Sequence, residues 1–322
     1  MKKKIIPIAI IALLITLGGY QFYEYRHPKS KVAITEQAET VGTKEVTINN
    51  TTNTQSINVV TDVPINGTYK GVIEVGASGF NSFVINMDAD KNWELVSKEF
   101  GESLAYEGFA TVDDVKLGLR KYLSNIFSKG VNGRNVHFVM SSGALKNPKT
   151  ELIAKGIETN GYVVNRVSAE QEGKYALKAI LPKSYKANSF VVDIGSGNTK
   201  ISWYENGKAN SIECSGAKYY QDGKKDQDVY NEVAAAISKV PKMNRQQCFI
   251  IGGVPFQMAK KVRQGNERFT LLKDPDFYSG GDDVKLKSGI NIYRSLTESS
   301  KCNTFIFDWD ANFTVGFLLT LN

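Results

Sequence analysis

The stretch Val191-Val-Asp-Ile-Gly-Ser-Gly-Asn-Thr-Lys-Ile-Ser-Trp203 joins two apolar runs through an acid and a short turn of glycines and hydroxyl residues. The stretch Ile73-Glu-Val-Gly-Ala-Ser-Gly-Phe-Asn-Ser-Phe-Val-Ile85 has the same design, about 120 residues earlier in the chain. Either stretch alone is typical of a glycine-rich β-hairpin, which needs no ligand to explain it. Two such hairpins in one chain predict two similar lobes that face each other across a cleft.

The residues of these two turns are suited to phosphate. A glycine turn lets backbone N–H groups approach phosphate oxygens because no Cβ stands in the way. Ser and Thr side chains add hydroxyl donors, and an acid at the end of a buried strand can hold Mg²⁺ directly or through water. The pair of turns therefore predicts a site for a phosphate-bearing ligand between the lobes.

Strands alternate with helices from residue 67 onward. Apolar residues at helical spacing follow Thr111, and Asp114 stands at the acidic position of a capping box, so we predict a helix that ends near Ser128. The alternation predicts α/β layers. Further helices are predicted over 148–158, 169–180, 226–240 and 255–262, strands over 69–75, 82–87, 135–141, 162–167, 189–195, 200–204, 248–251 and 304–307, and a strand or a helix over 313–321.

Three further segments carry a resemblance to a known family. They are Val139-Met-Ser-Ser-Gly-Ala-Leu-Lys146, Tyr162-Val-Val-Asn-Arg-Val-Ser-Ala-Glu-Gln-Glu-Gly-Lys-Tyr-Ala-Leu177 and Lys98-Glu-Phe-Gly-Glu-Ser-Leu104. Together with the two turns they resemble the exopolyphosphatase / guanosine pentaphosphate phosphatase family of the actin-like superfamily, over about residues 72–253. The resemblance implies an α/β, actin-like (ribonuclease H-like) two-lobed domain with mixed sheets. Because the chain is shorter than a full family core, we expect the second lobe to be trimmed.

The resemblance also implies roles for individual residues. Glu172, which lies 21 residues before Asp193, falls on the family's catalytic glutamate, which positions or deprotonates the attacking water. Without the resemblance, a solvated acid in the first turn of a helix would explain Glu172. Mg²⁺ is the implied cofactor, held by Glu74 and Asp193. The implied phosphate-binding residues are Gly76, Ala77, Ser78, Gly79, Gly195, Ser196, Gly197, Asn198 and Thr199, and Gly252 and Gly253 are candidates for nucleotide contact.

The chain departs from the family pattern at several of these positions. The first motif opens with Glu74 where the family has Asp, and a longer side chain displaces a bound metal; errors on the order of 1 Å can cost ~100-fold in rate. Gln171 replaces the first of the family's paired glutamates, and Lys174 replaces an Arg. A plain turn with Pro255 at the helix start explains the Gly-Gly segment almost as well as nucleotide contact does. Phosphate binding is therefore better supported than turnover.

The first 65 residues are set apart by composition. Lys2, Lys3 and Lys4 precede an uncharged run, 5–23, that predicts a transmembrane signal anchor over residues 1–23 in preference to a cleaved signal peptide, because no small-x-small cleavage site follows. The positive-inside rule gives a modest preference for an exported soluble body, periplasmic or extracytoplasmic. Residues 24–65 are polar and predict a flexible linker. We place lobe I at 66–186 and lobe II at 187–322.

Composition narrows the classes of ligand. The net charge of +7 is spread thinly outside the first residues, which favours an anionic ligand over nucleic acid. Cys214, Cys248 and Cys302 are far apart, so a zinc site is disfavoured; three buried thiols are favoured over one disulfide. His137 lies in an apolar run and is interpreted as a strand residue rather than a catalyst. The oligomeric state, monomer or homodimer, stays open.

Three functions compete at this level. The first is a membrane-tethered, Mg²⁺-dependent phosphohydrolase, in which water attacks a phosphoanhydride of polyphosphate or of a phosphorylated nucleotide. The second is a catalytically degenerate sensor that binds phosphate or nucleotide. The third, an assembling actin-like ATPase, is disfavoured because a membrane tether and a long spacer suit a solitary enzyme or receptor better. Phosphate-release assays with Mg²⁺ across polyphosphate, guanosine pentaphosphate and ATP would separate the first two.

Overall fold

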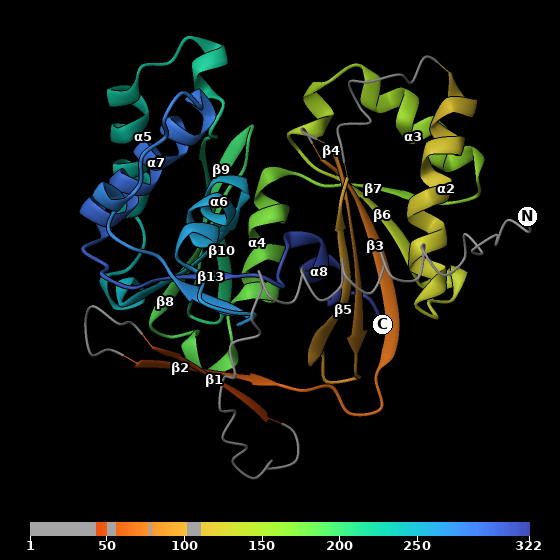
Figure 1. Ribbon diagram of the computed structural model, residues 1–322, viewed down its shortest axis with the longest axis horizontal. Helices are drawn as coiled ribbons and strands as arrows, with labels where there is room; N and C mark the ends of the chain where they lie inside the picture. The colour runs from red at the N-terminus through yellow and green to blue at the C-terminus, as the bar shows by residue number, and fades with distance from the viewer. Residues whose placement is uncertain (1–42, 50–55, 77–78, 102–110) are drawn as a thin grey trace, which may run out of the picture. The chain divides into compact units, whose positions relative to one another are not determined.

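Two mixed β-sheets with the same strand pattern form the framework (Figure 1). In each sheet three consecutive antiparallel strands are followed by two parallel strands, in the orders β5-β4-β3-β6-β7 and β10-β9-β8-β11-β13-β12, and the second sheet ends with β12, which is antiparallel to β13. The first sheet comprises β3 (Thr68–Gly76), β4 (Gly79–Met87), β5 (Trp93–Phe100), β6 (Val136–Met140) and β7 (Val164–Arg166). The second comprises β8 (Ser189–Ile194), β9 (Asn198–Glu205), β10 (Lys208–Ser215), β11 (Gln247–Gly252), β12 (Phe269–Leu271) and β13 (Phe305–Asp308).

Helices cover the outer face of each sheet and also lie between the sheets. The outer helices are α2 (Val112–Ser128) and α3 (Lys149–Thr159) on the first sheet, and α5 (Asp226–Ser238), α6 (Gly253–Val262) and α7 (Val284–Ser300) on the second. We call each sheet with its outer helices the first and the second lobe. Between the sheets lie α4 (Ala169–Ile180) and α8 (Phe313–Leu318). Short 3-10 helices span Gly133–Asn135, Ala144–Lys146, Lys183–Tyr185, Tyr219–Asp222, Lys242–Arg245 and Pro275–Phe277.

These elements come from a computed structural model that describes residues 43–49, 56–76, 79–101 and 111–322. Residues 41–322 form one compact unit. The membrane segment predicted over 5–23 lies outside the described residues. Within the described ranges, every helix is too short or too polar to cross a membrane.

Strand alternation decides which side chains reach the space between the sheets. Successive side chains of a strand point to opposite faces. In β3, Ile73 and Val75 pack under α2 and α3, so Glu74 faces the other way. In β8, Phe190, Val192 and Ile194 pack under the outer helices of the second lobe. Asp193 therefore also faces inward, which places two acids from equivalent strands on facing surfaces.

The predicted start of α2 is confirmed. Thr111 has extended backbone angles, and its hydroxyl accepts a hydrogen bond from the Asp114 backbone N–H while the Asp114 carboxylate accepts from the Thr111 backbone N–H. This capping box satisfies two N–H groups that a helix start leaves without partners. The helix buries Val115, Leu119 and Ile126 against the first sheet.

Close backbone approach sets the position of α4. A Cβ at Gly173 would come within 1.9 Å of the Ser211 hydroxyl of β10, and a Cβ at Gly316 of α8 would come within 1.8 Å of the Tyr175 carbonyl oxygen. No side chain fits at either position. The first turn of α4 is consequently held against the second sheet, although the helix follows the last strand of the first sheet.

Part of the predicted linker is structured instead. Thr43–Asn49 (β1) pairs antiparallel with Ser56–Asp62 (β2), in a region where the composition led us to expect a flexible chain over 24–65. Both segments alternate polar residues with Val, Ile and Thr, which favour strands. Val59 is fully buried and belongs to the core between the sheets. A few β-branched residues are thus enough for the two strands to pair, because Val59 packs into the apolar core between the two large sheets.

Candidate functional site

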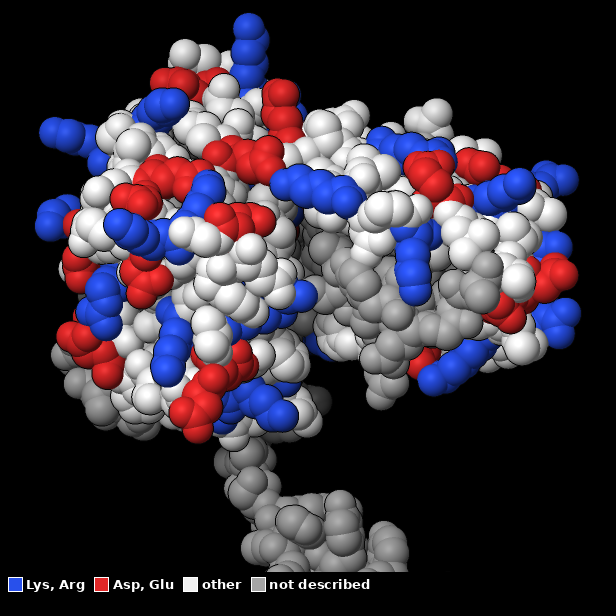
Figure 2. Space-filling model, turned by 90° about the horizontal axis from the view of Figure 1, so that it is seen from above, with Lys and Arg blue, Asp and Glu red and all other residues white. Residues whose placement is uncertain are grey.

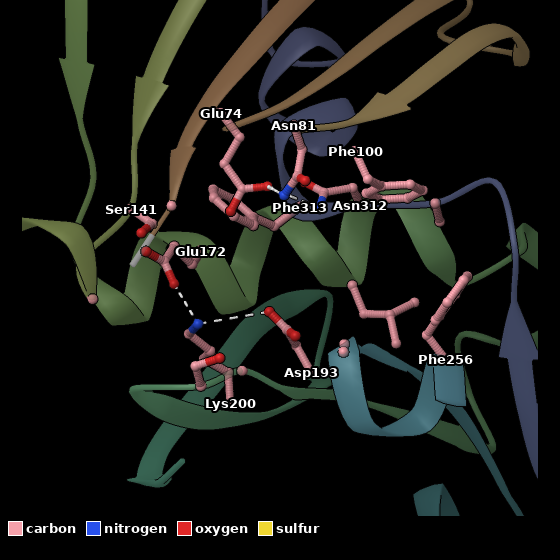
Figure 3. A pocket seen from close by; sticks show the side chains of 18 of the residues that line it. Glu74, Asn81, Phe100, Ser141, Glu172, Asp193, Lys200, Phe256, Asn312 and Phe313 are labelled. Carbon is pink, nitrogen blue, oxygen red and sulfur yellow. Dashed lines mark hydrogen bonds and ion pairs between the residues drawn. The ribbon is translucent and has the colours of Figure 1, made fainter. Parts of the chain in front are cut away.

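A cavity of about 420 Å³ lies between the two lobes, where the hairpins β3–β4 and β8–β9 face each other (Figure 3). The hollow between the lobes is visible in Figure 2, on a face where acidic and basic side chains are interspersed. Three glycine-containing turns contribute its wall. They supply Gly76 and Gly79, then Gly195, Ser196 and Gly197, then Gly252 and Gly253. Most of the predicted phosphate-binding residues are therefore gathered in one place; Ala77 and Ser78 lie outside the described residues.

The two hairpins are equivalent down to the register. Glu74 of β3 pairs with Asn81 of β4, and Asp193 of β8 pairs with Lys200 of β9 at the equivalent position, two residues before Gly76 and Gly195 respectively. All four side chains line the cavity. Each lobe thus presents an acid with a cross-strand partner, an amide in the first lobe and an ammonium in the second.

Glu74 is a carboxyl group without a cation beside it. The amide groups of Asn81 and Asn312 donate to its Oε2 over 2.9 and 3.2 Å. Burial, together with the negative charges of Glu172 and Asp193, raises the pKa of Glu74 to about 7, although the Asn81 hydrogen bond and Lys200 oppose the shift. Near neutral pH this carboxyl group is therefore divided between its protonated and charged forms.

Glu172 lies deep in the cavity wall. It belongs to the first turn of α4, which starts at a capping box of Ser168 and Gln171, and its side chain is fully buried. One oxygen accepts a hydrogen bond from the backbone N–H of Ser142. The other is 2.5 Å from Nζ of Lys200. The alternative explanation of Glu172 as a solvated surface acid is wrong, since both oxygens are engaged inside the protein.

Lys200 is the positive charge that compensates this group. Its Nζ also lies 3.6 Å from Oδ2 of Asp193, and the residue is only 5% exposed. Burial alone would lower the pKa of Lys200, but the charges of Asp193 and Glu172 outweigh it and raise the pKa above the ordinary value. The ammonium group is held in its charged form, between one carboxylate from α4 and another from β8 (Figure 3).

This arrangement does not fit a divalent cation held between the two lobes. Glu74, Glu172 and Asp193 are oxygen donors of the kind Mg²⁺ prefers. The ammonium of Lys200, however, already contacts the oxygens of Glu172 and Asp193, and it can supply no ligand atom of its own because it has donors only. A Mg²⁺ ion at Asp193 would meet a fixed positive charge. Among the described residues no cluster of three or more acidic, His or Cys side chains has the geometry to hold a metal ion.

The second glycine turn is tied to the first lobe. Nδ2 of Asn198 donates to the Ser142 hydroxyl over 3.0 Å and to the Glu213 carboxylate over 2.8 Å. Thr199, which the resemblance placed among the phosphate ligands, is fully buried and does not line the cavity. The reason is strand alternation: Asn198 and Lys200 point toward the cavity, so the residue between them points away.

The third turn carries the Gly-Gly pair expected to contact a nucleotide. Gly252 ends β11 with φ 111°, a conformation that favours glycine, and a Cβ there would come within 2.2 Å of the Ile194 carbonyl oxygen. Gly253 begins α6, and both residues line the cavity. Nucleotide contact by this turn stays a prediction.

One side of the cavity is apolar, which the sequence did not predict. Phe100 of β5 and Phe256 of α6 have ring centroids 6.0 Å apart across the cavity, and Trp309 stacks edge-on against Phe256. Lys285 of α7 also lines the cavity, and burial with the nearby charge of Lys218 lowers its pKa. The site thus combines a polar, glycine-rich side with an aromatic side.

Sequence reasoning also missed Lys200, Asn81 and Asn312. Lys200 and Asn81 could have been found from the hairpins themselves, because a two-residue turn fixes the cross-strand partner of each acid. Asn312 could not have been found in this way. It lies 238 residues from Glu74 and reaches it only because α8 returns to the first lobe.

Comparisons with known proteins agree with this geometry at the level of the fold. No family model matches the sequence, and no curated protein matches it. Among solved structures, the chain is similar to a Ppx/GppA family member from Aquifex aeolicus, with TM-score 0.60, 15% identity, and coverage of 79% of this chain and 97% of that one. It is also similar to an exopolyphosphatase from Cytophaga hutchinsonii, with TM-score 0.59, 16% identity, and coverage of 79% and 97%.

These likenesses establish that the chain has the mixed α/β, two-sheet fold of the Ppx/GppA exopolyphosphatases, as the resemblance implied. They also correct one expectation. A trimmed second lobe is wrong, because the chain covers 97% of both relatives. Beyond residue 253 the sequence resemblance ends, but the shared fold continues. The elements β12, α7 and β13 complete the second lobe, and α8 completes the layer between the sheets.

Proposed function

We propose that the cleft binds a ligand through its phosphate groups, as a polyphosphate chain or a phosphorylated nucleotide does. The observation that supports this most directly is the convergence of three glycine-containing turns on one cavity, beside a buried ammonium. Backbone N–H groups in such turns can reach phosphate oxygens, and a lysine ammonium adds a point charge. The fold shared with exopolyphosphatases supports the same ligand class.

Hydrolysis of a phosphoanhydride is the second candidate. Glu172 supports it, because it is a carboxylate in the cavity wall at the position that the resemblance assigns to the catalytic base. As a base, Glu172 would accept a proton from the attacking water. Its oxygens are engaged by Ser142 and Lys200, so the ion pair must loosen before Glu172 can accept the proton. Mg²⁺, expected from the resemblance, would supply charge stabilisation on the phosphate, but Asp193 and Lys200 leave no fitting place for it.

The chain acts at a membrane in this proposal. Residues 5–23 anchor it, and the soluble body is exported, as the lysines at the amino terminus favour. Fractionation of cells that express the full chain tests the anchor, and protease digestion of intact cells or spheroplasts tests the side. A soluble form that begins near residue 20–30 would contradict the anchor.

Calorimetric titration of the full chain with inorganic tripolyphosphate tests ligand binding. Gly197→Asp adds a negative charge to the cavity wall, where a Cβ has its nearest neighbour at 3.6 Å and so fits. We expect it to weaken binding at least tenfold, about 1.4 kcal/mol, because the new carboxylate repels the anionic ligand at the cavity wall. Gly133→Asp adds the same charge on the surface and is the matched control. Equal affinities of both variants would contradict the proposal.

Phosphate release from polyphosphate, guanosine pentaphosphate and ATP tests hydrolysis. Glu172→Gln should lower the rate ~10²–10⁴-fold if Glu172 is the base. Tripolyphosphate affinity of the same variant reports whether the cavity is intact. An unchanged rate would remove Glu172 as the base, and no release by the wild type on any substrate would leave ligand binding as the function.

A further inference from the structure

The charge pattern around Lys200 has no counterpart in the first lobe. Three carboxyl groups, those of Glu74, Glu172 and Asp193, line one cavity together with the ammonium of Lys200. The ammonium is at ion-pair distance from two of them, at 2.5 and 3.6 Å. Glu74 instead has two amide partners. Glu172 and Asp193 thus share a cation that belongs to the chain itself.

Lys200 is also fixed in place. Its strand β9 lies between β8 and β10, and the adjacent residues Thr199 and Ile201 are fully buried. The register opposite Asp193 is set by the glycine turn, and Glu172 is held by the Ser142 backbone. The Lys200 side chain therefore has little freedom to leave the space between the two carboxylates. Its departure would leave two buried carboxylates without a cation, which is strongly destabilising.

We propose that Lys200 is a built-in cation that takes the place of a divalent metal between Glu172 and Asp193. It follows that the cleft binds no metal at these residues. A second consequence rests on the proposed function: the phosphate-bearing ligand is bound without a metal as well. An ammonium group has three donors, so at least one remains for an oxygen of the bound anion after the contacts with Glu172 and Asp193.

The proposal predicts that a metal site appears when the lysine is removed. In Lys200→Gln, the cavity keeps the carboxyl groups of Glu172 and Asp193 but has lost the cation between them. This full-length variant should bind Mn²⁺ at least about tenfold more tightly than the wild type does. Binding is measured in phosphate-free buffer from the loss of the EPR signal of free Mn²⁺. Mg²⁺ should raise the Tm of Lys200→Gln by ~3 °C or more and leave the wild-type Tm unchanged.

Two control variants separate this effect from a general change in charge. Lys285→Gln removes another lysine from the same cavity, one that forms no ion pair with Glu172 or Asp193, and should create no Mn²⁺ site. Lys200→Gln combined with Asp193→Asn lacks one of the two acids and should lose the Mn²⁺ site. An equal gain of Mn²⁺ binding in Lys285→Gln would overturn the proposal.

The wild-type chain decides the question even if Lys200→Gln does not fold. If the wild type binds Mn²⁺ at micromolar concentration and Asp193→Asn abolishes that binding, the lysine moves aside for a metal and the proposal is overturned. Lys200→Arg keeps the positive charge and should bind no Mn²⁺. Absence of Mn²⁺ binding in the wild type and in Lys200→Arg supports the proposal.

Inorganic phosphate, which chelates Mg²⁺ only weakly, tests the second consequence. The wild type should bind phosphate with the same affinity, within about threefold, in EDTA and in Mg²⁺. Binding that requires Mg²⁺ would overturn metal-free ligand recognition. If phosphate and tripolyphosphate fail to bind under any condition, the proposed function fails, while the Mn²⁺ titrations still decide the role of Lys200.

Discussion

The hairpins β3–β4 and β8–β9 differ in the residue that lies opposite the acid, and this difference gives the acids of the two lobes different electrostatic surroundings. Both place an acid two residues before the turn glycines and face the same cavity. In the first, Asn81 donates a hydrogen bond to Glu74, but an amide cannot cancel a charge, and burial raises the pKa of Glu74 to about 7. In the second, the ammonium of Lys200 is at ion-pair distance from both Asp193 and Glu172.

The comparison shows how one backbone design can host two kinds of buried acid. Burial disfavours a charged carboxyl group unless a partner offsets the cost of desolvation. A hydrogen-bonded amide offsets part of that cost, and an ammonium offsets more of it. The first lobe therefore responds to pH near neutrality, whereas the second carries a fixed ion pair.

The largest effect is expected when the ammonium is removed. Lys200→Met leaves Glu172 and Asp193 buried without a cation, which should lower the free energy of unfolding by roughly 3–5 kcal/mol. Urea unfolding at pH 8 measures the loss. Lys174→Met removes a lysine that pairs with Glu170 on the surface, and this control should cost less than about 1 kcal/mol. Similar losses in the two variants would show that Lys200 is an ordinary salt-bridge residue.

The next effect concerns the first hairpin and pH. Because the folded-state pKa of Glu74 is raised from 4.5 to about 7, the folded chain binds more protons than the unfolded chain between these values. Stability should fall as pH rises through that window, by roughly 3 kcal/mol from this group alone. Unfolding free energies at pH 5 and pH 8 test this, and Glu74→Gln should remove that part of the difference. An unchanged difference in the variant would assign the pH dependence to other groups.

A smaller effect is expected when the first hairpin is given the partner of the second. Asn81→Lys places an ammonium opposite Glu74 in the same register in which Lys200 faces Asp193. An opposite charge within a few ångströms lowers a carboxyl pKa, so the pH 5 to pH 8 difference should shrink by ~2 kcal/mol. Thr68→Lys, at an exposed position of β3 in the same hairpin, is the control for added charge. A difference that stays at its wild-type size would mean that the amide does not control Glu74.

The smallest effect concerns the second amide on Glu74. Asn312→Ser keeps an oxygen able to cap α8 and removes the Nδ2 donor that reaches Glu74 over 3.2 Å. The expected loss of stability is about 0.5–1.5 kcal/mol, the usual worth of one hydrogen bond. Thermal unfolding at pH 8 measures it, where more of Glu74 is charged than at pH 5. A loss that is equal at both pH values would point to the helix cap instead.

The sequence by itself determined the local parts of this molecule. The two glycine turns, the capping box at Thr111, and most of the strands and helices up to α6 follow from short-range patterns, and the structure has them. Helix α7 was missed, because several of its buried positions are Ser and Gly, which blur the apolar period. The strands β1 and β2 were missed because their composition is mostly polar.

Only the tertiary structure decided the long-range partners of the acids. Lys200 meets Glu172 because Gly173 lets α4 rest on the second sheet, and Asn312 meets Glu74 because α8 returns between the sheets. Short-range patterns set backbone conformation, but the charge state of a buried carboxyl group depends on which distant side chains packing brings within a few ångströms. That is why the sequence could locate the acids of the cleft and, through the hairpin register, their cross-strand partners, while packing decided that Glu172 shares the cation of Asp193 and that Glu74 is buried beside a second amide.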